Sequence, residues 1–207
     1  MHRIDHVVFG VGDLDVAARR LWDECGLEAQ PRSDHAGAGT ANRIVPVGND
    51  QMIELLAISD SGSPHPIVPW LARLLANGDR LLQVMIDPGE IDATAARLGE
   101  PVRELERVAD DGRRIAFRLT GIAGSFGPGM LPGFVSCSEG REWRCGFEPP
   151  KHKVRTGGIR WVELGSDEAK VWAQIPDRSL PFRFVPGRPG VSAVALELDG
   201  REVVLRA

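Results

Sequence analysis

Apolar and polar residues alternate along residues 3–10, which is the spacing of a strand that buries one face. Strict alternation places His6 on the same face as Ile4 and places Asp5 on the opposite face. Over the next stretch the apolar positions recur every three or four residues, which predicts a helix with Asp13 as its N-cap. The chain therefore opens with a strand followed by a helix.

Three short strands are predicted after this helix. They correspond to LEAQPRS, TANRIVPVG and QMIELLAI, which begin at residues 27, 40 and 51. Turn-forming residues separate them, and Gly48-Asn49-Asp50 joins the last two into a hairpin. Residues 1–60 thus predict one β-α-β-β-β module.

The same order of elements recurs twice more along the chain. The predicted division is a connecting helix at 61–79, a second β-α-β-β-β module at 80–140, a linker at 141–158 and a third module at 159–207. Matching the helices of the first two modules puts Gln83 at the place of His6. In the third module, Ile159 takes the place of His6 and Val204 that of Glu54. The chain thus has an internal repeat.

This repeat determines the predicted fold class. A single module cannot bury both faces of its sheet, so modules must pair. The prediction is an α+β fold of repeated modules that pair through their curved sheets. Ser166 as a helix cap and the Asp199-Gly200 hairpin support the third module. The alternative is an α+β sandwich in which the repeat is accidental.

Composition and charge narrow the classes of partner. The chain has 207 residues, 43% of them apolar and 26% charged, with a net charge of −4 and no basic block. A nucleic-acid partner is therefore not expected. No apolar run approaches the roughly 20 residues of a membrane span, so no membrane partner is expected either. The three cysteines form no CxxC motif, which favours reduced thiols and a cytoplasmic location.

Three segments of the sequence carry a resemblance. IDHVVFGVGDLDVAARRL, HAGAGTAN and MIELLAI are similar, in this order, to the glyoxalase-like branch of the vicinal oxygen chelate superfamily. LPGFVS and GGIRWVEL resemble later parts of the same pattern. The resemblance implies paired β-α-β-β-β modules curled around a cavity, often with a divalent metal held by the first and fourth strands. It does not fix the reaction, because members include lyases, isomerases, dioxygenases and binding proteins.

His6 and Glu54 are the central candidate pair. The resemblance places the first and fourth strands of a module side by side, so both side chains would point into one cavity. There they would hold a divalent ion, or act as a base and the group that orients it. The alternative is a simple hydrogen-bonded pair, since a buried glutamate needs a partner.

A metal site would need further ligands. The resemblance makes Gln83 the third ligand, after His6 and Glu54, and draws the fourth from LPGFVSCS. That stretch has no Asp, Glu or His, so Ser136 or Cys137 would have to substitute. The set is therefore incomplete: a nickel, manganese, iron or zinc ion is one prediction, and a site without metal is the other.

A second group of candidates surrounds His35. His35 would close the cavity mouth as an acid, a base or a further ligand, while Gly39, Thr40 and Asn42 would bind substrate. The alternative is a glycine-rich turn whose polar groups bond to local backbone. Trp143 is the tryptophan expected to line a ligand pocket, and His152 is expected to be a solvated loop residue.

Two functions remain open from sequence. The first is a lyase- or isomerase-type enzyme that acts on a small oxygen-rich metabolite through His6, His35 and Glu54. The second is a non-catalytic protein that binds or sequesters a small molecule in the same cavity. Convergence of the three side chains within a few ångströms favours catalysis. A homodimer is also expected, because the third module lacks a sequence partner.

Overall fold

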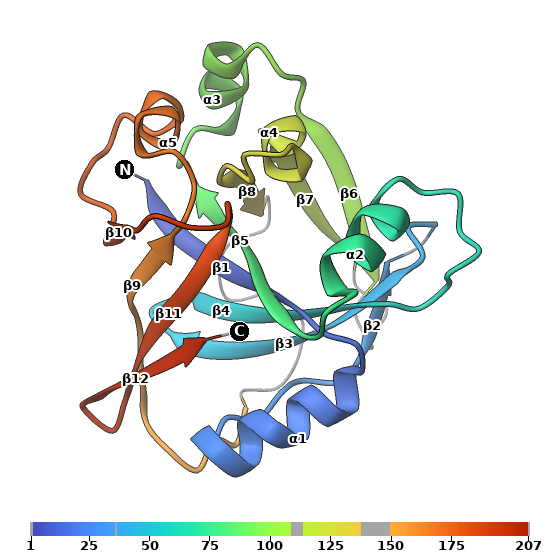
Figure 1. Ribbon diagram of the computed structural model, residues 1–207, viewed down its shortest axis with the longest axis vertical. Coiled ribbons are helices and arrows are strands. Elements are labelled where there is room, and N and C mark those ends of the chain that lie inside the picture. Colours follow the sequence, from blue (N-terminus) through green and yellow to red (C-terminus); the bar gives the residue numbers. More distant parts are fainter. Residues whose placement is uncertain (1, 36, 109–113, 138–149, 207) are drawn as a thin grey trace.

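The computed structural model describes residues 2–35, 37–108, 114–137 and 150–206. Its elements, in order, are β1 (Arg3–Gly10), α1 (Leu14–Cys25), β2 (Ser33–His35), β3 (Thr40–Gly48), β4 (Gln51–Ile58), α2 (Ile67–Leu75), β5 (Arg80–Asp87), α3 (Ile91–Leu98), β6 (Arg103–Val108), β7 (Arg114–Thr120), α4 (Ile122–Phe126), β8 (Gly133–Cys137), β9 (Thr156–Leu164), α5 (Glu168–Gln174), β10 (Phe182–Phe184), β11 (Val191–Leu198) and β12 (Arg201–Arg206). Figure 1 shows their arrangement.

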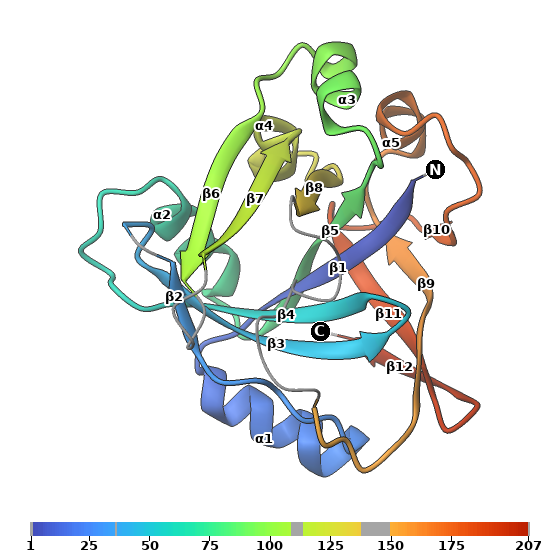
Figure 2. The ribbon, with the colours of Figure 1, turned by 180° about the vertical axis from the view of Figure 1, so that it is seen from behind.

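The strands form two sheets. The larger sheet has eight strands in the order β2-β3-β4-β1-β5-β8-β7-β6, and the smaller has four in the order β10-β9-β11-β12. In the larger sheet β1 and β5 run antiparallel at the centre, β1 pairs with β4 in parallel, and β5 pairs with β8 in parallel. The two halves of this sheet therefore repeat one another, and its strands curl as they pass from β2 to β6 (Figures 1 and 2). The predicted α+β class with curled sheets is confirmed.

The last segment has the expected elements but a different pairing. β9 pairs with β10 in parallel and with β11 antiparallel, whereas β12 pairs with β11. Ile159 faces Leu196 and Val204 faces Ala195, so these two residues do not lie on neighbouring strands as His6 and Glu54 do. Their expected equivalence to that pair is wrong, and the boundaries of the three modules stay a prediction.

The larger sheet has two buried faces, which we call outer and inner. The outer face carries Val7, Ile53 and Val84 and packs against α1 and the small sheet, through residues such as Val162 and Leu196. These apolar contacts explain why the small sheet lies against the larger one, with β9 beside β3 and β4 and with β11 beside β5 (Figure 1).

The inner face carries Val8, Leu56 and Met85, which pack with α2 and the α4 region. Trp70 of α2 and Phe126 of α4 meet edge to face above it, with ring centroids 4.7 Å apart. The two faces thus have separate apolar cores, and the inner one is the smaller.

Local sequence signals fix several element ends. The side chain of Asp13 accepts hydrogen bonds from the backbone of Asp15 and Val16, and Gly26 ends α1 with a left-handed φ of 70°. Asn49 and Asp50 both have positive φ in the β3–β4 turn, as a type I′ hairpin requires. These three predictions are confirmed.

Other local predictions are wrong. β2 is confined to residues 33–35 rather than the stretch from 27, where Pro31 has no N–H to donate to a ladder. Asp167, not Ser166, caps α5. The buried Ser166 hydroxyl instead donates to the Met130 carbonyl and accepts from the Gly190 N–H, so it ties two loops together.

His152 is held in place rather than solvated. Its Nδ1 accepts from the Glu28 backbone N–H at 2.9 Å, so the other ring nitrogen carries the proton and donates to the Pro46 carbonyl at 2.7 Å. The segment after residue 150 is thereby fastened to the first half of the larger sheet. Among the described residues, no helix is long and apolar enough to cross a membrane.

Candidate functional site

A β-bulge in β1 shapes the candidate site. Ile4 faces Ile86 and His6 faces Met85, so the register between β1 and β5 shifts at Asp5, which is the extra residue of the bulge. The bulge places Ile4 in the outer core, whereas strict alternation predicted it on the face of His6. It also lets Asp5, whose side chain is 3% exposed, approach its neighbour: Asp5 Oδ1 lies 2.7 Å from His6 Nδ1.

Glu54 meets His6 from the neighbouring strand. β1 and β4 are paired so that Val8 faces Glu54, and His6 lies two residues away on the same face. Glu54 Oε2 is 3.5 Å from His6 Nε2, and both side chains are 15% exposed. The imidazole of His6 therefore lies between two carboxylates, one at each ring nitrogen.

Asn42 and Thr40 of β3 orient Glu54 and His35. Asn42 Nδ2 donates to Glu54 Oε1 at 2.7 Å, and Thr40 Oγ1 lies 2.9 Å from His35 Nδ1. The other ring nitrogen of His35, Nε2, is 3.9 Å from Glu54 Oε1. His6, His35 and Glu54 thus converge, and Asn42 and Thr40 hold two of them in position.

Gly39 shapes the turn beneath these groups. Its φ is +68°, and a Cβ there would lie 2.4 Å from the Ser63 Cβ. Its carbonyl accepts from the backbone N–H groups of Ser59 and Asp60. In the structure, Gly39 allows the β2–β3 turn to pack against the loop after β4.

The two carboxylates set the charge of His6. Burial alone would lower its pKa, but hydrogen bonds to Asp5 and Glu54 and their negative charges outweigh burial and raise the pKa to about 9. Burial would raise the pKa of Glu54, but the hydrogen bond and charge of His6, the charge of His35 and the hydrogen bond from Asn42 lower it to about 2. At neutral pH the pair is an imidazolium beside a carboxylate.

In the second half of the sheet, other residues occupy the positions that match His6 and Glu54. Gln83 faces Val8 across the β1–β5 ladder and is 7% exposed, and its Oε1 has no hydrogen-bond partner among the described residues. Val8 faces Glu54 in the first half, and the matching pair in the second half is Met85 and Gly133. Gly133 therefore stands where a fourth ligand would be, and it has no side chain to offer.

The donor set does not fit the four-ligand metal site that the resemblance implies. A Cβ at Gly133 would lie 2.6 Å from Ser125 Oγ and 2.7 Å from Met85 Sδ, so these side chains already fill the fourth position. Within the described residues, no three His, Cys, Asp or Glu side chains are arranged to hold a metal ion. Metal binding by His6, Glu54 and Gln83 stays a prediction.

The sequence missed Asp5 as a site residue. Its only signal was its position directly before His6, and alternation assigns neighbouring residues to opposite faces. The bulge that brings the two side chains together is not visible in the apolar pattern. Trp143, the tryptophan expected in the pocket, lies outside the described residues.

Three solved structures are similar to this chain, and the first of them has the same fold over almost its whole length. A hypothetical protein from Staphylococcus aureus is similar in structure, with 13% identity, a TM-score of 0.70, and coverage of 99% of this chain and 98% of that one. Methylmalonyl-CoA epimerase from Mycobacterium tuberculosis has 25% identity and a TM-score of 0.44, covering 65% of this chain and 86% of its own. The Streptomyces coelicolor epimerase has 22% identity and a TM-score of 0.45, covering 66% and 95%.

No curated protein matches the sequence significantly. The family of glyoxalase-like domains, in contrast, matches residues 4–179, which include both halves of the eight-stranded sheet and most of the third segment before β10. This match confirms the resemblance carried by the first strand, the His35 turn and the Glu54 strand. The chain belongs to the family of glyoxalase-like domains.

Proposed function

We propose that the chain is a lyase- or isomerase-type enzyme that moves a proton on a small oxygen-rich metabolite. The observation that supports this proposal is the convergence of His6, His35 and Glu54, with Nε2 of each histidine within 3.9 Å of a Glu54 oxygen. A scaffold gains little from burying such a pair, because desolvation offsets much of the attraction between the charges.

His6 is the proton donor in this proposal. With a pKa of about 9 it is protonated at neutral pH, so it cannot accept a proton as the base expected from sequence. It can donate a hydrogen bond to a substrate carbonyl oxygen and stabilise the negative charge that develops there. His6 Nε2 lies 3.5 Å from Glu54 Oε2, which is long for a hydrogen bond. A substrate oxygen can therefore replace the carboxylate as the acceptor of the Nε2 hydrogen.

His35 is the proposed base. Its side chain is 31% exposed, about twice as much as those of His6 and Glu54, so a ligand reaches it first. It would take a proton from the carbon next to the substrate carbonyl, and the electron pair would move onto the oxygen held by His6. Return of the proton to another carbon or face gives isomerisation. Loss of a neighbouring leaving group gives elimination.

Deuterium exchange tests this proposal. The chain is incubated in D₂O with hydroxyacetone, dihydroxyacetone and related hydroxy-carbonyl compounds, and NMR follows the loss of their C–H signals. We expect exchange above the buffer rate, lost in His35→Gln and retained in His65→Gln, a histidine in an exposed loop. Compounds that bind to the chain but exchange no faster than in buffer would contradict catalysis.

A small-molecule binding protein is the second candidate. It is favoured by Gln83 and Gly133, which leave no ionisable group at the positions of the second half that match His6 and Glu54, and by Trp70 and Phe126 on the inner face. Binding without exchange in the same experiment would support it.

Metal content is a separate test. We predict that the metal bound after incubation with nickel, manganese, iron or zinc falls well short of one ion per chain, since Gly133 offers no ligand. One ion per chain, lost in both Glu54→Gln and His6→Ala, would establish the metal site expected from sequence. Homodimerisation and a cytoplasmic location also stay predictions.

A further inference from the structure

A pocket lies away from the His6–Glu54 pair. It has a volume of about 490 Å³ and is formed by the α2–β5 connection, the start of β5 and residues of β9, β11 and the loop before β11. Neither histidine of the candidate site, nor Glu54, lines it. This volume falls within the range of about 300–1,000 Å³ that is usual for small-molecule sites.

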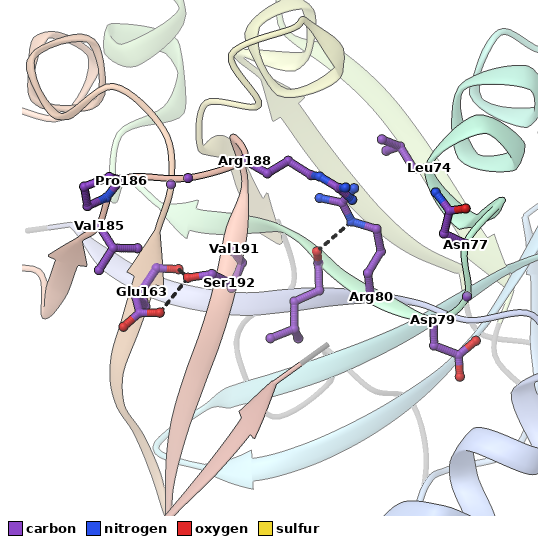
Figure 3. A pocket seen from close by; sticks show the side chains of 14 residues that line it. Leu74, Asn77, Asp79, Arg80, Glu163, Val185, Pro186, Arg188, Val191 and Ser192 are labelled. Carbon is purple, nitrogen blue, oxygen red and sulfur yellow. Dashed lines mark hydrogen bonds between the residues drawn. The ribbon is translucent and has the colours of Figure 1, made fainter.

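Two arginines approach each other across this pocket. Arg80 comes from the first position of β5 and Arg188 from the loop before β11, and Figure 3 shows their guanidinium groups directed toward each other. Burial lowers the pKa of Arg80, and the positive charge of Arg188 lowers it further, so the two charges are close enough to interact. Like charges brought together in this way repel unless an anion lies between them.

The carboxylates in the pocket are engaged elsewhere. Glu163 Oε1 accepts from Ser192 Oγ at 2.7 Å and lies 3.4 Å from Arg206 Nη1. Asp79 Oδ1 accepts from the Gly12 backbone N–H at 2.8 Å. Among the described residues, neither Arg80 nor Arg188 forms an ion pair with a carboxylate. Arg80 Nε donates to the Leu81 carbonyl at 3.5 Å, and no described residue accepts from its terminal nitrogens.

The loop that carries Arg188 is firmly placed. A Cβ at Gly165 would lie 2.1 Å from the Arg188 carbonyl oxygen, so the loop packs directly on the glycine backbone. At the end of the loop, the Gly190 carbonyl accepts from the Gly165 N–H, and the Gly190 N–H donates to Ser166. These contacts hold the Arg188 backbone next to the pocket before any ligand arrives, so little ordering would be needed on binding.

We infer that this pocket binds the phosphate group of a small phosphorylated molecule, held between Arg80 and Arg188. A phosphate monoester carries close to two negative charges at neutral pH, which matches two guanidinium groups. Arginine also presents paired N–H donors whose geometry fits two phosphate oxygens. The volume exceeds what a bare phosphate needs, so the rest of the molecule would extend toward Ser192 and Asn77. This site is independent of the proposed proton transfer.

Calorimetric titration of the full chain tests the inference. Glycerol 3-phosphate and inorganic phosphate are compared at constant ionic strength, with potassium chloride as the reference salt. We expect saturable binding that Arg80→Gln and Arg188→Gln each weaken at least about ten-fold. Arg201→Gln, which removes the same charge from an exposed position at the start of β12, should leave binding unchanged.

The two ligands distinguish the source of the phosphate. Tighter binding of glycerol 3-phosphate would identify a phosphorylated metabolite, and equal affinity would identify free phosphate. Thermal unfolding of each variant confirms that it is folded. The inference would be overturned if neither ligand showed saturable binding. It would also be overturned if Arg201→Gln weakened binding as much as Arg80→Gln and Arg188→Gln do.

Discussion

The two halves of the eight-stranded sheet share one backbone pairing but differ in chemistry. In the first half the pair Val8–Glu54 lies beside His6, and in the second half the matching pair Met85–Gly133 lies beside Gln83. The first half therefore has an imidazolium and a carboxylate where the second has a neutral amide and a glycine. Strand pairing alone does not require ionisable groups, so those of the first half are to be explained by function.

The largest expected effect comes from making the first half resemble the second. Glu54→Gln keeps the hydrogen-bonding shape but removes the charge that faces both histidines. We expect proton exchange on the best hydroxy-carbonyl compound to fall by about 10²–10⁴-fold, the usual contribution of acid–base groups such as the two histidines that Glu54 holds. The rate is measured by deuterium incorporation, with His65→Gln as the control. A loss below ten-fold would contradict a catalytic role for Glu54.

The next largest effect is expected in the pH dependence of stability, which the ionisable pair of the first half produces. The pKa of His6 rises from 6.5 to about 9 on folding, so its contribution is complete below pH 6.5 and is lost as the pH rises through 9. The pKa of Glu54 falls from 4.5 to about 2, so its contribution is complete above pH 4.5 and is lost as the pH falls through 2.

We therefore expect the free energy of unfolding to fall by about 2–3 kcal/mol between pH 6.5 and 9. His6→Gln should flatten this decline, because the titrating group is gone. Urea unfolding at a series of pH values measures it. An equally steep decline in His6→Gln would show that another group is responsible.

Adding a side chain at Gly133 tests whether Ser125 and Met85 already occupy the position of a fourth ligand. Gly133→Ala would bring a Cβ within 3 Å of Ser125 Oγ and the Met85 thioether, so we expect destabilisation by about 1–3 kcal/mol. Gly187→Ala is the control, since nothing lies within 4 Å of its Cβ position, and its effect should stay within about 0.5 kcal/mol. Chemical denaturation compares the two variants. Equal stability of both would mean that the fourth position is open to a ligand.

The smallest effect is expected at Gln83. Its buried Oε1 has no hydrogen-bond partner in the part of the chain that the structure describes, so replacing the amide by an apolar side chain of similar size should remove a desolvation cost. We expect Gln83→Met to stabilise the chain by about 1 kcal/mol and to leave proton exchange unchanged, as measured by urea unfolding and deuterium incorporation. A loss of exchange would instead assign Gln83 to the site.

The sequence predicts local features of this molecule well. Asp13, Gly26 and the Asn49-Asp50 turn act through contacts within a few residues, so their signals survive without tertiary context. The repeat and the three segments typical of the family predicted the fold class. The same segments singled out His6 and Glu54, which the structure places within 3.5 Å.

Features that depend on long-range packing were not predicted. The bulge at Asp5 arises where β1 and β5 lose register, and the different pairing of β9 and β12 depends on how the small sheet packs on the larger one. The pocket between Arg80 and Arg188 joins residues more than 100 positions apart, and no sequence spacing signals it. In each case the partner is distant in sequence, so local patterns carry no information about it.

The pH at which His6 titrates tests most directly whether its imidazole is held in the charged form between Asp5 and Glu54. The five histidines of the chain are labelled with ¹³C and ¹⁵N, and the signals of His6 are assigned by their absence in His6→Gln. We expect His6 to titrate at a pH of about 9 and Asp5→Asn to lower this value. A His6 that titrates near 6.5, unaffected by Asp5→Asn, would contradict an imidazolium held between Asp5 and Glu54.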